Sequence, residues 1–468
     1  MKFFFSMGLA LVSLSAQAAV SSNSPALITA TNGASRLLRP LSVADALDLA
    51  LQQNGAVRKS AAQLEATHGV IVQTRAIAWP RLAISGNYTA NEDSSTDRLR
   101  VKSYTPVVTP GGGSNVVKSD DSLEYANQRW SADIRLTQSI YEGGRITSAL
   151  RTARLTREQA LLNHQTVLAD TLRDVRVAYC DVLLAQQLIA VQEASVKLLQ
   201  RELEETTKRM NVGNVPRFNV LRAEVEVANA RPKLIRARNS FRTSKDRLAT
   251  LLGEKIPRGT DELPLQLTDK LEAAPWPGDL SLSVQRAFEQ RTELRALRKA
   301  EDLRAETVAG AKAGYKPSLQ IFGGYGTKSS QFSDDLTDEL HGWEAGAQLQ
   351  WNLFDGFLTK GKVDEAKSLG RLANEELLEA ERNVELDVRT AYSSLGEARE
   401  VLDSQEKVQE SAEESLRLAT ARADAGTTTQ LDVLNAQTAL TEARSTQAQA
   451  LHDYAVARAK LERAVGRP

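Results

Sequence analysis

Four short stretches of the chain alternate between apolar and polar residues, which is the pattern of a β-strand with two different faces. Residues 82–89 and 130–137 form the first pair, and residues 318–325 and 343–351 repeat it later in the chain. In both pairs the tryptophans fall on the apolar face, while polar residues occupy much of the other face. We therefore predict four strands in two hairpins, each with one apolar side.

A very long helix is predicted after each pair of strands. No proline interrupts the chain between Gly144 and Pro216, which favours one helix of roughly 68 residues, about 100 Å long. Gly213 would end this helix, and Pro216 lies where a second helix can begin and return the chain to Gly253. The apolar positions of the first helix form a heptad seam, at Leu161, Leu168, Leu172, Val175, Tyr179 and Val182.

The chain contains two copies of one unit. Trp130 matches Trp343 and Gly253 matches Gly466 at one common separation in the sequence, and no gap is needed between them. Each copy is predicted to hold a helix, a β-hairpin and a long helical hairpin. The first repeat is assigned to 19–253 and the second to 280–466, with a linker at 254–279 that contains four prolines.

The first copy is longer than the second. Pro80 matches Pro317, but these two prolines are farther apart in the sequence than Trp130 and Trp343 are. The first copy therefore carries extra residues between Pro80 and Trp130. The inserted residues include Pro106 and three consecutive glycines, from which we predict a loop. A single helix is predicted over 42–78, because Pro80 would stop it.

The N-terminus predicts export from the cytoplasm. Lys2 is followed by an apolar run and by Ala16-Gln17-Ala18, the pattern of a signal peptide over 1–18. No later stretch approaches about 18 uncharged apolar residues, which argues against a helical membrane protein.

Composition narrows the possible functions. The chain has 59 Lys and Arg and 59 Asp and Glu, so its formal net charge is zero. This balance excludes general electrostatic binding to nucleic acid, which needs a surplus of positive charge. The single Cys180 and four scattered histidines suggest no metal site. We expect no cofactor and no enzymatic activity, because the motifs of nucleotide-binding, serine-hydrolase and zinc-protease sites are missing.

In an exported protein, strands with one apolar and one polar face are typical of an outer-membrane barrel. Aromatic side chains would then lie at the membrane interfaces, namely Trp130, Trp343, Trp351, Tyr88 and Tyr325. Four strands cannot close a barrel and open edges are not tolerated in lipid, so several chains must pool eight, twelve or sixteen strands. The alternative is a soluble periplasmic coiled-coil structural or adaptor protein, in which the apolar strand faces have no obvious core to cover.

Several motifs together resemble a known family. They are LSVADALDLALQQN at 41–54, YEGGR at 141–145, LFDGF at 353–357, and the paired VGNVPRFNVLRAE at 212–224 and AGTTTQLDVLNAQ at 425–437. From Leu41 to Gly466 the chain resembles the TolC family of outer-membrane efflux and type I secretion channels.

The resemblance implies a mainly helical fold with some β-structure, in which a homotrimer forms a twelve-stranded barrel with four strands per chain. Long helical hairpins would continue the barrel as a periplasmic α-barrel. The implied location is the outer membrane of a Gram-negative bacterium, in contact with its lipid. The implied partners are a periplasmic adaptor (membrane fusion) protein and an inner-membrane ABC or RND-type transporter.

The same resemblance places a pore constriction near the periplasmic tip turns at Gly213 and Gly426. In the family, a network of a Tyr, an Arg and an Asp closes this constriction. The corresponding residues here are Ala423, Thr428 and Asn219, so none of the three is kept. Asp432 matches an acidic position one helical turn inward, where three copies would form a carboxylate ring, and Asn435 occupies the next position. Arg217 is a candidate partner for Asp432.

Overall fold

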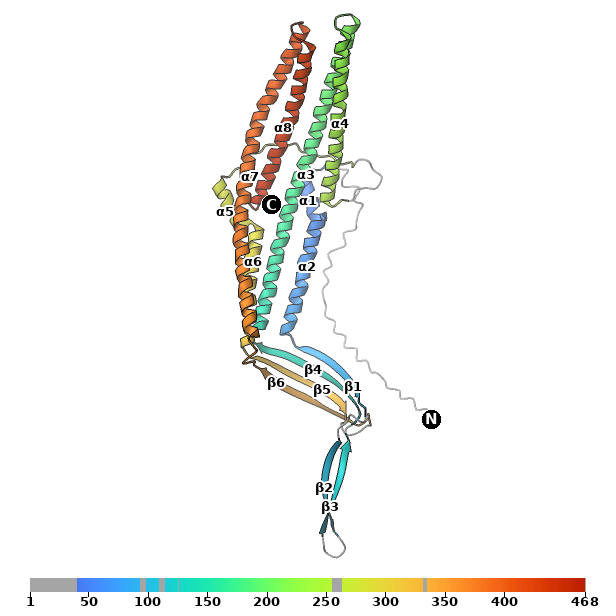
Figure 1. Cartoon of the computed structure of the whole chain (residues 1–468), viewed down its shortest axis with the longest axis vertical. Helices are drawn as coiled ribbons and strands as arrows, with labels where there is room; N and C mark the ends of the chain where they lie inside the picture. Colours follow the sequence, from blue (N-terminus) through green and yellow to red (C-terminus); the bar gives the residue numbers. More distant parts are fainter. Residues whose placement is uncertain are drawn as a thin grey trace, which may run out of the picture.

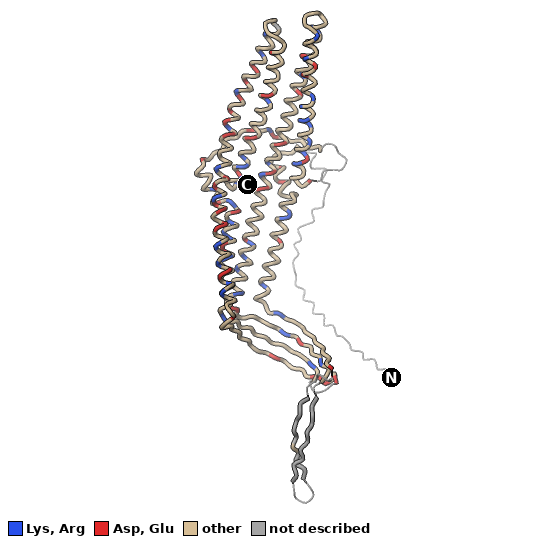
Figure 2. Tube along the Cα trace, in the orientation of Figure 1, with Lys and Arg blue, Asp and Glu red and all other residues tan. Residues whose placement is uncertain are grey.

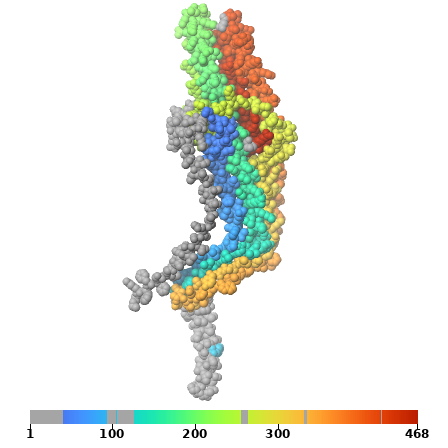
Figure 3. Space-filling view, turned by 180° about the vertical axis from the view of Figure 1, so that it is seen from behind, coloured from blue at the N-terminus to red at the C-terminus, as the bar shows by residue number. Residues whose placement is uncertain are grey.

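The computed structural model describes residues 40–92, 98–108, 114–124, 126–254, 263–330 and 335–467. The chain is elongated, with a four-stranded sheet near one end and two helical hairpins at the other (Figure 1). Seen from behind, it is a thin curved wall in which the two helical hairpins stand side by side (Figure 3). The predicted signal peptide at 1–18, the glycines at 111–113 and part of the linker, 255–262, lie outside the described residues.

Two helices of 67 residues, α3 (Arg145–Asn211) and α7 (Leu358–Asp424), run from the sheet to the tips. At the tips they turn back into α4 (Arg217–Leu252) and α8 (Gln430–Ala464). The predicted long helix, its end near Gly213 and its return to Gly253 are thus confirmed. The half of the helical layer near the sheet also contains α1 (Val43–Gln53), α2 (Gly55–Arg75), α5 (Leu280–Gln290) and α6 (Thr292–Lys312), with short 3-10 turns η2 (Ala76–Ala78) and η4 (Ala313–Tyr315).

The helices form a single layer. Towards the tips the contacts give the order α4–α3–α8–α7, and towards the sheet they give α2–α3–α6–α7. One edge of the layer is therefore built from α2 and α4, and the other edge is α7 throughout. Although α3 has an 18-residue window of mean hydropathy 1.3, apolar enough by length and composition to cross a membrane, it packs against α2, α4, α6 and α8 within this layer.

Both halves of the chain break their first helix at the same place. The helix predicted over 42–78 is divided at Asn54, whose side chain accepts hydrogen bonds from the amides of Ala56 and Val57 and so begins a new helix. Asn54 also donates to the carbonyl of Leu251 at 2.6 Å, which ties the break to the end of α4. In the second half Arg291 separates α5 from α6 at the position equivalent to Asn54.

The returning helices end directly against these breaks. Gly253 and Gly466 have positive φ angles of 79° and 85°. A Cβ at Gly253 would lie 2.4 Å from the carbonyl oxygen of Gln53, and one at Gly466 would lie 3.0 Å from the Cβ of Gln290. Glycine is therefore required at both positions, by backbone conformation and by close approach.

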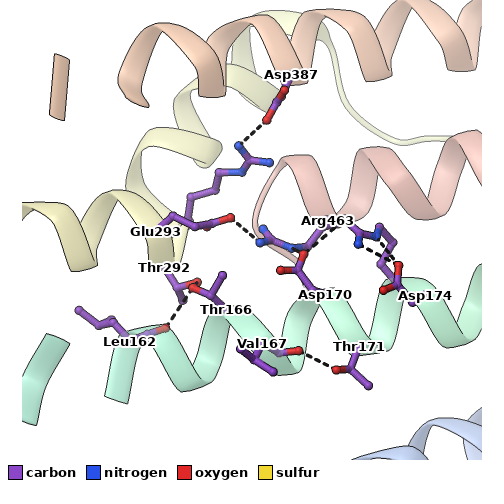
Figure 4. Close-up of polar contacts among 12 residues, drawn as sticks. Leu162, Thr166, Val167, Asp170, Thr171, Asp174, Thr292, Glu293, Asp387 and Arg463 are labelled. Atoms are coloured by element: carbon purple, nitrogen blue, oxygen red, sulfur yellow. Dashed lines mark hydrogen bonds and ion pairs between the residues drawn. The ribbon is translucent and has the colours of Figure 1, made fainter. Parts of the chain in front are cut away.

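Ion pairs made by two buried arginine side chains fasten the joint in the second half (Figure 4). Arg463, near the end of α8, donates to Asp170 of α3 at 2.9 Å and to Glu293 of α6. Arg291 donates to Asp387 of α7 at 3.0 Å. The arginine side chains are buried, at 9% and 7% exposure, whereas the carboxylates of Asp387, Asp170 and Glu293 are 58%, 40% and 33% exposed, so the pairs are only partly buried.

The corresponding joint in the first half is mainly apolar. Val175, Tyr179 and Val182 of α3 are buried against α1 and α4, and the Tyr179 hydroxyl donates to the carbonyl of Leu41 at 2.9 Å. The heptad seam was therefore correct here but wrong at its start, because Leu161 is 45% exposed.

The four predicted strands form one antiparallel sheet in the order β1-β4-β5-β6. Their bounds are β1 (Arg81–Ala90), β4 (Gln128–Glu142), β5 (Ser318–Ser329) and β6 (Glu339–Gln350). Within the described ranges, β1 and β6 are edge strands with one unpaired side each.

The inserted residues of the first copy do not form the predicted loop. They contain a separate two-stranded sheet of β2 (Arg98–Val108) and β3 (Ser114–Glu124), which projects beyond the four-stranded sheet (Figure 1). Pro106 is compatible with β2 because a strand in a two-stranded ribbon has one side without ladder bonds. Proline and glycine content alone was therefore a misleading signal.

Replacing residues 98–124 by a short Gly-Ser turn should leave the protein folded, because β2 and β3 are not paired with the four-stranded sheet. We expect the amount of folded protein, measured by immunoblot of cell fractions, to stay within about twofold of wild type. As a control, Arg135→Pro in the central strand β4 removes a ladder hydrogen bond and should abolish assembly. Loss of assembly in the deletion would show that the β2–β3 ribbon is needed for folding.

Candidate functional site

One face of the four-stranded sheet is continuously apolar and exposed. The pairing register places Ile84 opposite Ile134 and Tyr325 opposite Trp343, so the apolar side chains of all four strands share one face. Ile84 is 78% exposed and Trp343 is 80% exposed. The other large exposed members of this face are Leu82, Tyr88, Leu136, Ile321 and Leu349.

The opposite face of the sheet is polar. Arg135 of β4 lies over the ring of Phe322, 4.3 Å from its centroid, and pairs with Glu344 of β6 at 3.5 Å. Gly324 lies between Arg135 and Glu344 in the register, and a Cβ at Gly346 would come within 2.7 Å of the Phe322 ring. Because Gly324 and Gly346 have no side chains, they leave room on this face for Arg135 and Phe322 to stack.

The predicted interface aromatics lie at two levels of the sheet. Tyr88 is paired with Trp130 and Tyr325 with Trp343 in the half farther from the helices. Trp351 follows β6 at the helical end, where its indole donates to the carbonyl of Tyr315 at 3.2 Å. From Trp343 to Trp351 the strand extends about 26 Å, which at a strand tilt of roughly 40° spans about 20 Å of the roughly 25 Å apolar band of an outer-membrane barrel.

The two tip turns have the same geometry. Gly213 and Gly426 have φ angles of 78° and 74°. The amide of Asn214 donates to the carbonyl of Arg209, and that of Thr427 to the carbonyl of Arg422, both at 2.9 Å. These bonds satisfy carbonyl groups at the ends of α3 and α7, and glycine adopts the left-handed conformation that the turn requires.

Asp432 has a local structural role. It caps the start of α8, because its Oδ2 accepts hydrogen bonds from the hydroxyls of Thr428 at 2.6 Å and Thr429 at 2.7 Å, and from the Thr429 amide. These three bonds hold the pKa of Asp432 below its usual value. The carboxylate is therefore ionised at neutral pH, and its stabilising effect is lost only as the pH falls through the lowered pKa.

Of the other candidate entrance residues, Thr428 is the one that is hydrogen-bonded to Asp432 in the part of the chain that the structure describes. Asn435 and Arg217 are exposed, while Asn219, which corresponds to Asp432 in the first copy, is half-buried. Among the described residues of one chain, no ion pair joins Arg217 to Asp432. The proposed pairing of these two residues is therefore not present within a single chain.

Sequence reasoning missed a contact that joins the two helical hairpins near their tips. Gln430, the first residue of α8, donates from Nε2 to Glu202 of α3 at 2.6 Å and also to the hydroxyl of Thr206. Thr206 is almost fully buried. No local signal identifies this contact, because its partners lie in the other copy, far away in the sequence.

A family comparison decides the assignment. Residues 46–254 and 283–467 match the family described as outer membrane efflux protein. The chain belongs to this family. As an outer membrane efflux protein, it is an export channel of the outer membrane with a periplasmic helical part.

Individual relatives agree with this assignment. The outer membrane protein TolC of Vibrio cholerae is 26% identical over 364 residues, covering 77% of this chain and 82% of the relative. TolC of Escherichia coli is 24% identical over 426 residues, covering 88% and 80%. The crystal structure of the Campylobacter jejuni CmeC outer membrane channel has a TM-score of 0.74 at 14% identity, covering 91% of this chain and 85% of that one. These relatives are named as outer-membrane or channel proteins, so a periplasmic coiled-coil protein is not favoured.

In an outer membrane efflux protein the exposed apolar face should contact lipid, and Ile84→Arg tests this. A charged side chain facing lipid costs about 2–4 kcal/mol at the bilayer midplane, so we expect several-fold less protein in the outer-membrane fraction. Ser85→Arg is the matched control, because the next residue of β1 faces the polar side opposite Asp133. Equal effects of the two substitutions would contradict the assignment of the lipid-facing side.

Proposed function

We propose that the protein is a homotrimeric exit duct, in which three chains pool their strands into a twelve-stranded barrel and their hairpins into a helical tunnel. The observation that carries this proposal is the exposed apolar face, which ends at β1 and β6, each with one side unpaired within the residues that the structure describes. Lipid does not tolerate unpaired strand edges, and β1 of one chain can pair with β6 of the next. The single-layer arrangement of the helices supports the same closure.

The proposed duct is passive and works with two partners. A periplasmic adaptor protein would contact the tip turns at Gly213 and Gly426, and an inner-membrane ABC or RND-type transporter would supply the energy. The support for this assembly is membership of the efflux family together with the position of the tips, which lie at the far end of the helices from the sheet (Figure 1). We expect no catalytic site, since the relatives named above are channel proteins.

We further propose that each chain consists of two copies of one unit, 19–253 and 280–466, joined by the linker 254–279. Equal lengths of corresponding helices support this division, since α3 and α7 both have 67 residues and α2 and α6 both have 21. The starts of α3 and α7 have the same separation as Trp130 and Trp343. The starts of α1 and α5, and those of α2 and α6, have the same separation as Pro80 and Pro317.

We propose that the pore constriction lies at the tips and includes Asp432, Asn435, Asn219, Arg217 and Thr428. Three exposed Asp432 carboxylates would form an acidic ring that favours cations. Within each chain, the contact of Gln430 with Glu202 and Thr206 would hold the two hairpins together, in place of the Tyr, Arg and Asp contacts that this sequence lacks. Arg217 remains a candidate partner for Asp432 of a neighbouring chain.

Crosslinking in mild detergent tests the proposed trimer. We expect a covalent species of three chains after crosslinking of outer-membrane extracts, and this species should persist on heating before electrophoresis. The chain is 51.1 kDa, so monomer and trimer separate clearly on a gel. A monomer, or a location in the inner membrane, would refute the proposed duct.

Asp432→Asn tests the acidic ring. We expect lower cation selectivity and weaker block by divalent and trivalent metal ions in planar-bilayer recordings, because the ring loses three negative charges. Thr429→Ala is the matched control, since it removes a hydrogen-bond donor of the same cap without changing charge. If Asp432→Asn leaves selectivity and metal block unchanged, or if Thr429→Ala has the same effect, Asp432 acts only as a helix cap.

A further inference from the structure

Polar contacts join the two helical hairpins of one chain. α8 lies next to α3 (Figure 1), and side chains of α8 form hydrogen bonds to α3 at intervals of eleven residues, which is about three turns of an almost straight helix. The apolar clusters in the described ranges lie to one side or the other of this line. We call it the hairpin interface. Its members on α8 are Gln430, Thr441, His452 and Arg463, and their respective partners on α3 are Glu202 with Thr206, Ser195, Asp181 and Asp170.

His452 differs from the other members because both of its ring nitrogens face a carboxylate. Nε2 lies 2.8 Å from Oδ1 of Asp181 on α3, and Nδ1 lies 2.9 Å from Oδ1 of Asp453, the next residue of α8. The side chain of His452 is only 11% exposed. A carboxylate only accepts hydrogen bonds, and a neutral imidazole has a single N–H donor. Both contacts are therefore satisfied only by the protonated, positively charged ring.

Charged and polar groups from three helices surround the two carboxylates. On α4, Arg247 lies 3.8 Å from the other oxygen of Asp181. On α8 itself, the amide of Gln449 donates to Asp453 at 2.9 Å and lies 3.5 Å from Nδ1 of the ring. On the side of α7, Glu397 lines the same groove as Asp453. The ring is thus the positive centre of a cluster in which carboxylates predominate.

The charge of this cluster depends on pH through its histidine. Burial opposes the charged form of His452, but the hydrogen bonds and charges of Asp181 and Asp453 outweigh burial and raise the pKa of His452 above its ordinary value. The stabilisation is therefore complete below about pH 6.5, the ordinary pKa of histidine, and is lost as the pH rises through the raised pKa.

The other ionisable groups near the ring keep their charge in this range. Burial, together with the charge of Asp181, raises the pKa of the adjacent Cys180 to about 11, so its thiol stays neutral. Lysines, arginines and carboxylates are interspersed along both hairpins (Figure 2), and their ordinary pKa values lie well outside the range from about 6 to 9. A change of pH within this range therefore acts on the hairpin interface through His452.

We propose that His452 is a pH-sensitive clamp between the two hairpins, closed while the ring is protonated and weakened when the ring loses its proton. In the neutral ring, either tautomer leaves a nitrogen lone pair facing a carboxylate oxygen, and the remaining hydrogen bond loses the contribution of the positive charge. The clamp lies roughly six helical turns from the tip, where α8 begins at Gln430. Its weakening would let the tip halves of the hairpins separate more easily. The effect on the pore rests on the proposed duct, whereas the clamp is a contact within one chain.

Hydrogen exchange of the full-length protein in mild detergent, measured by mass spectrometry, tests the clamp. Peptides from 445–459 of α8 and 175–188 of α3 should exchange at least about fivefold faster at about pH 9 than at about pH 6, after correction for the intrinsic effect of pH on exchange, because a charge-assisted bond is lost. In His452→Gln this pH dependence should disappear, since glutamine does not titrate. The matched control is His164→Gln, which changes a histidine of α3 that contacts Ser60 of α2 and should leave the pH dependence intact.

Asp453→Asn is a second variant that keeps the imidazole. It removes one of the two carboxylates, so it should lower the pKa of His452 and move the loosening of the hairpin interface at least about half a unit towards lower pH. Equal corrected exchange of the wild-type protein at the two pH values would overturn the clamp. Persistence of the pH dependence in His452→Gln would overturn it as well.

Planar-bilayer recordings test the effect on the pore. The conductance of wild-type channels should rise between about pH 6 and pH 9 as the histidine loses its proton, and it should stay constant in His452→Gln. A hairpin interface that loosens without any change in conductance would overturn the effect on the pore and leave the clamp standing. Absence of channel conductance in the wild-type protein would instead refute the proposed duct, while hydrogen exchange would still decide on the clamp.

Discussion

The physical constraint on which the structure depends is the need to satisfy every backbone hydrogen-bonding group in lipid. A four-stranded sheet with one exposed apolar face cannot meet this need alone, because among the described residues β1 and β6 each leave one side unpaired. The same requirement for a partner acts on the helices, which form one layer rather than a closed bundle and therefore expose two edges. The sheet and the helical layer thus both end in edges on the same two sides of the chain. The proposed ring of identical chains would cover the edges of both.

The sequence predicted the large elements well because strong local signals mark their ends. Gly213, Pro216 and Gly253 limit the first helical hairpin, and alternating apolar residues mark the four strands of the main sheet. The errors came from positions where tertiary structure overrides a local pattern. Asn54 divides a helix because the end of α4 packs against it, and β2 forms although Pro106 indicated a loop.

The candidate site was predictable only as far as its residues act locally. The pair Thr429 and Asp432 has the spacing of a capping box, so the sequence itself carries a local signal for this cap. Gln430 had no such signal, since its partners Glu202 and Thr206 come from the other copy. A periodic pattern identifies which face of a helix is buried, but it does not identify which distant helix covers that face.

The difference between continuous and interrupted helices has a mechanical consequence. In each chain α3 and α7 are continuous helices of about 100 Å. Their neighbours are interrupted at equivalent positions, where Asn54 separates α1 from α2 and Arg291 separates α5 from α6. A layer built in this way resists compression along its length but offers least bending stiffness where half of its members are interrupted. One of these hinges is fastened mainly by apolar packing and the other by buried arginines. Flexing of the wall would therefore be unequal in the two halves of each chain, and would swing the tips sideways rather than shorten the wall.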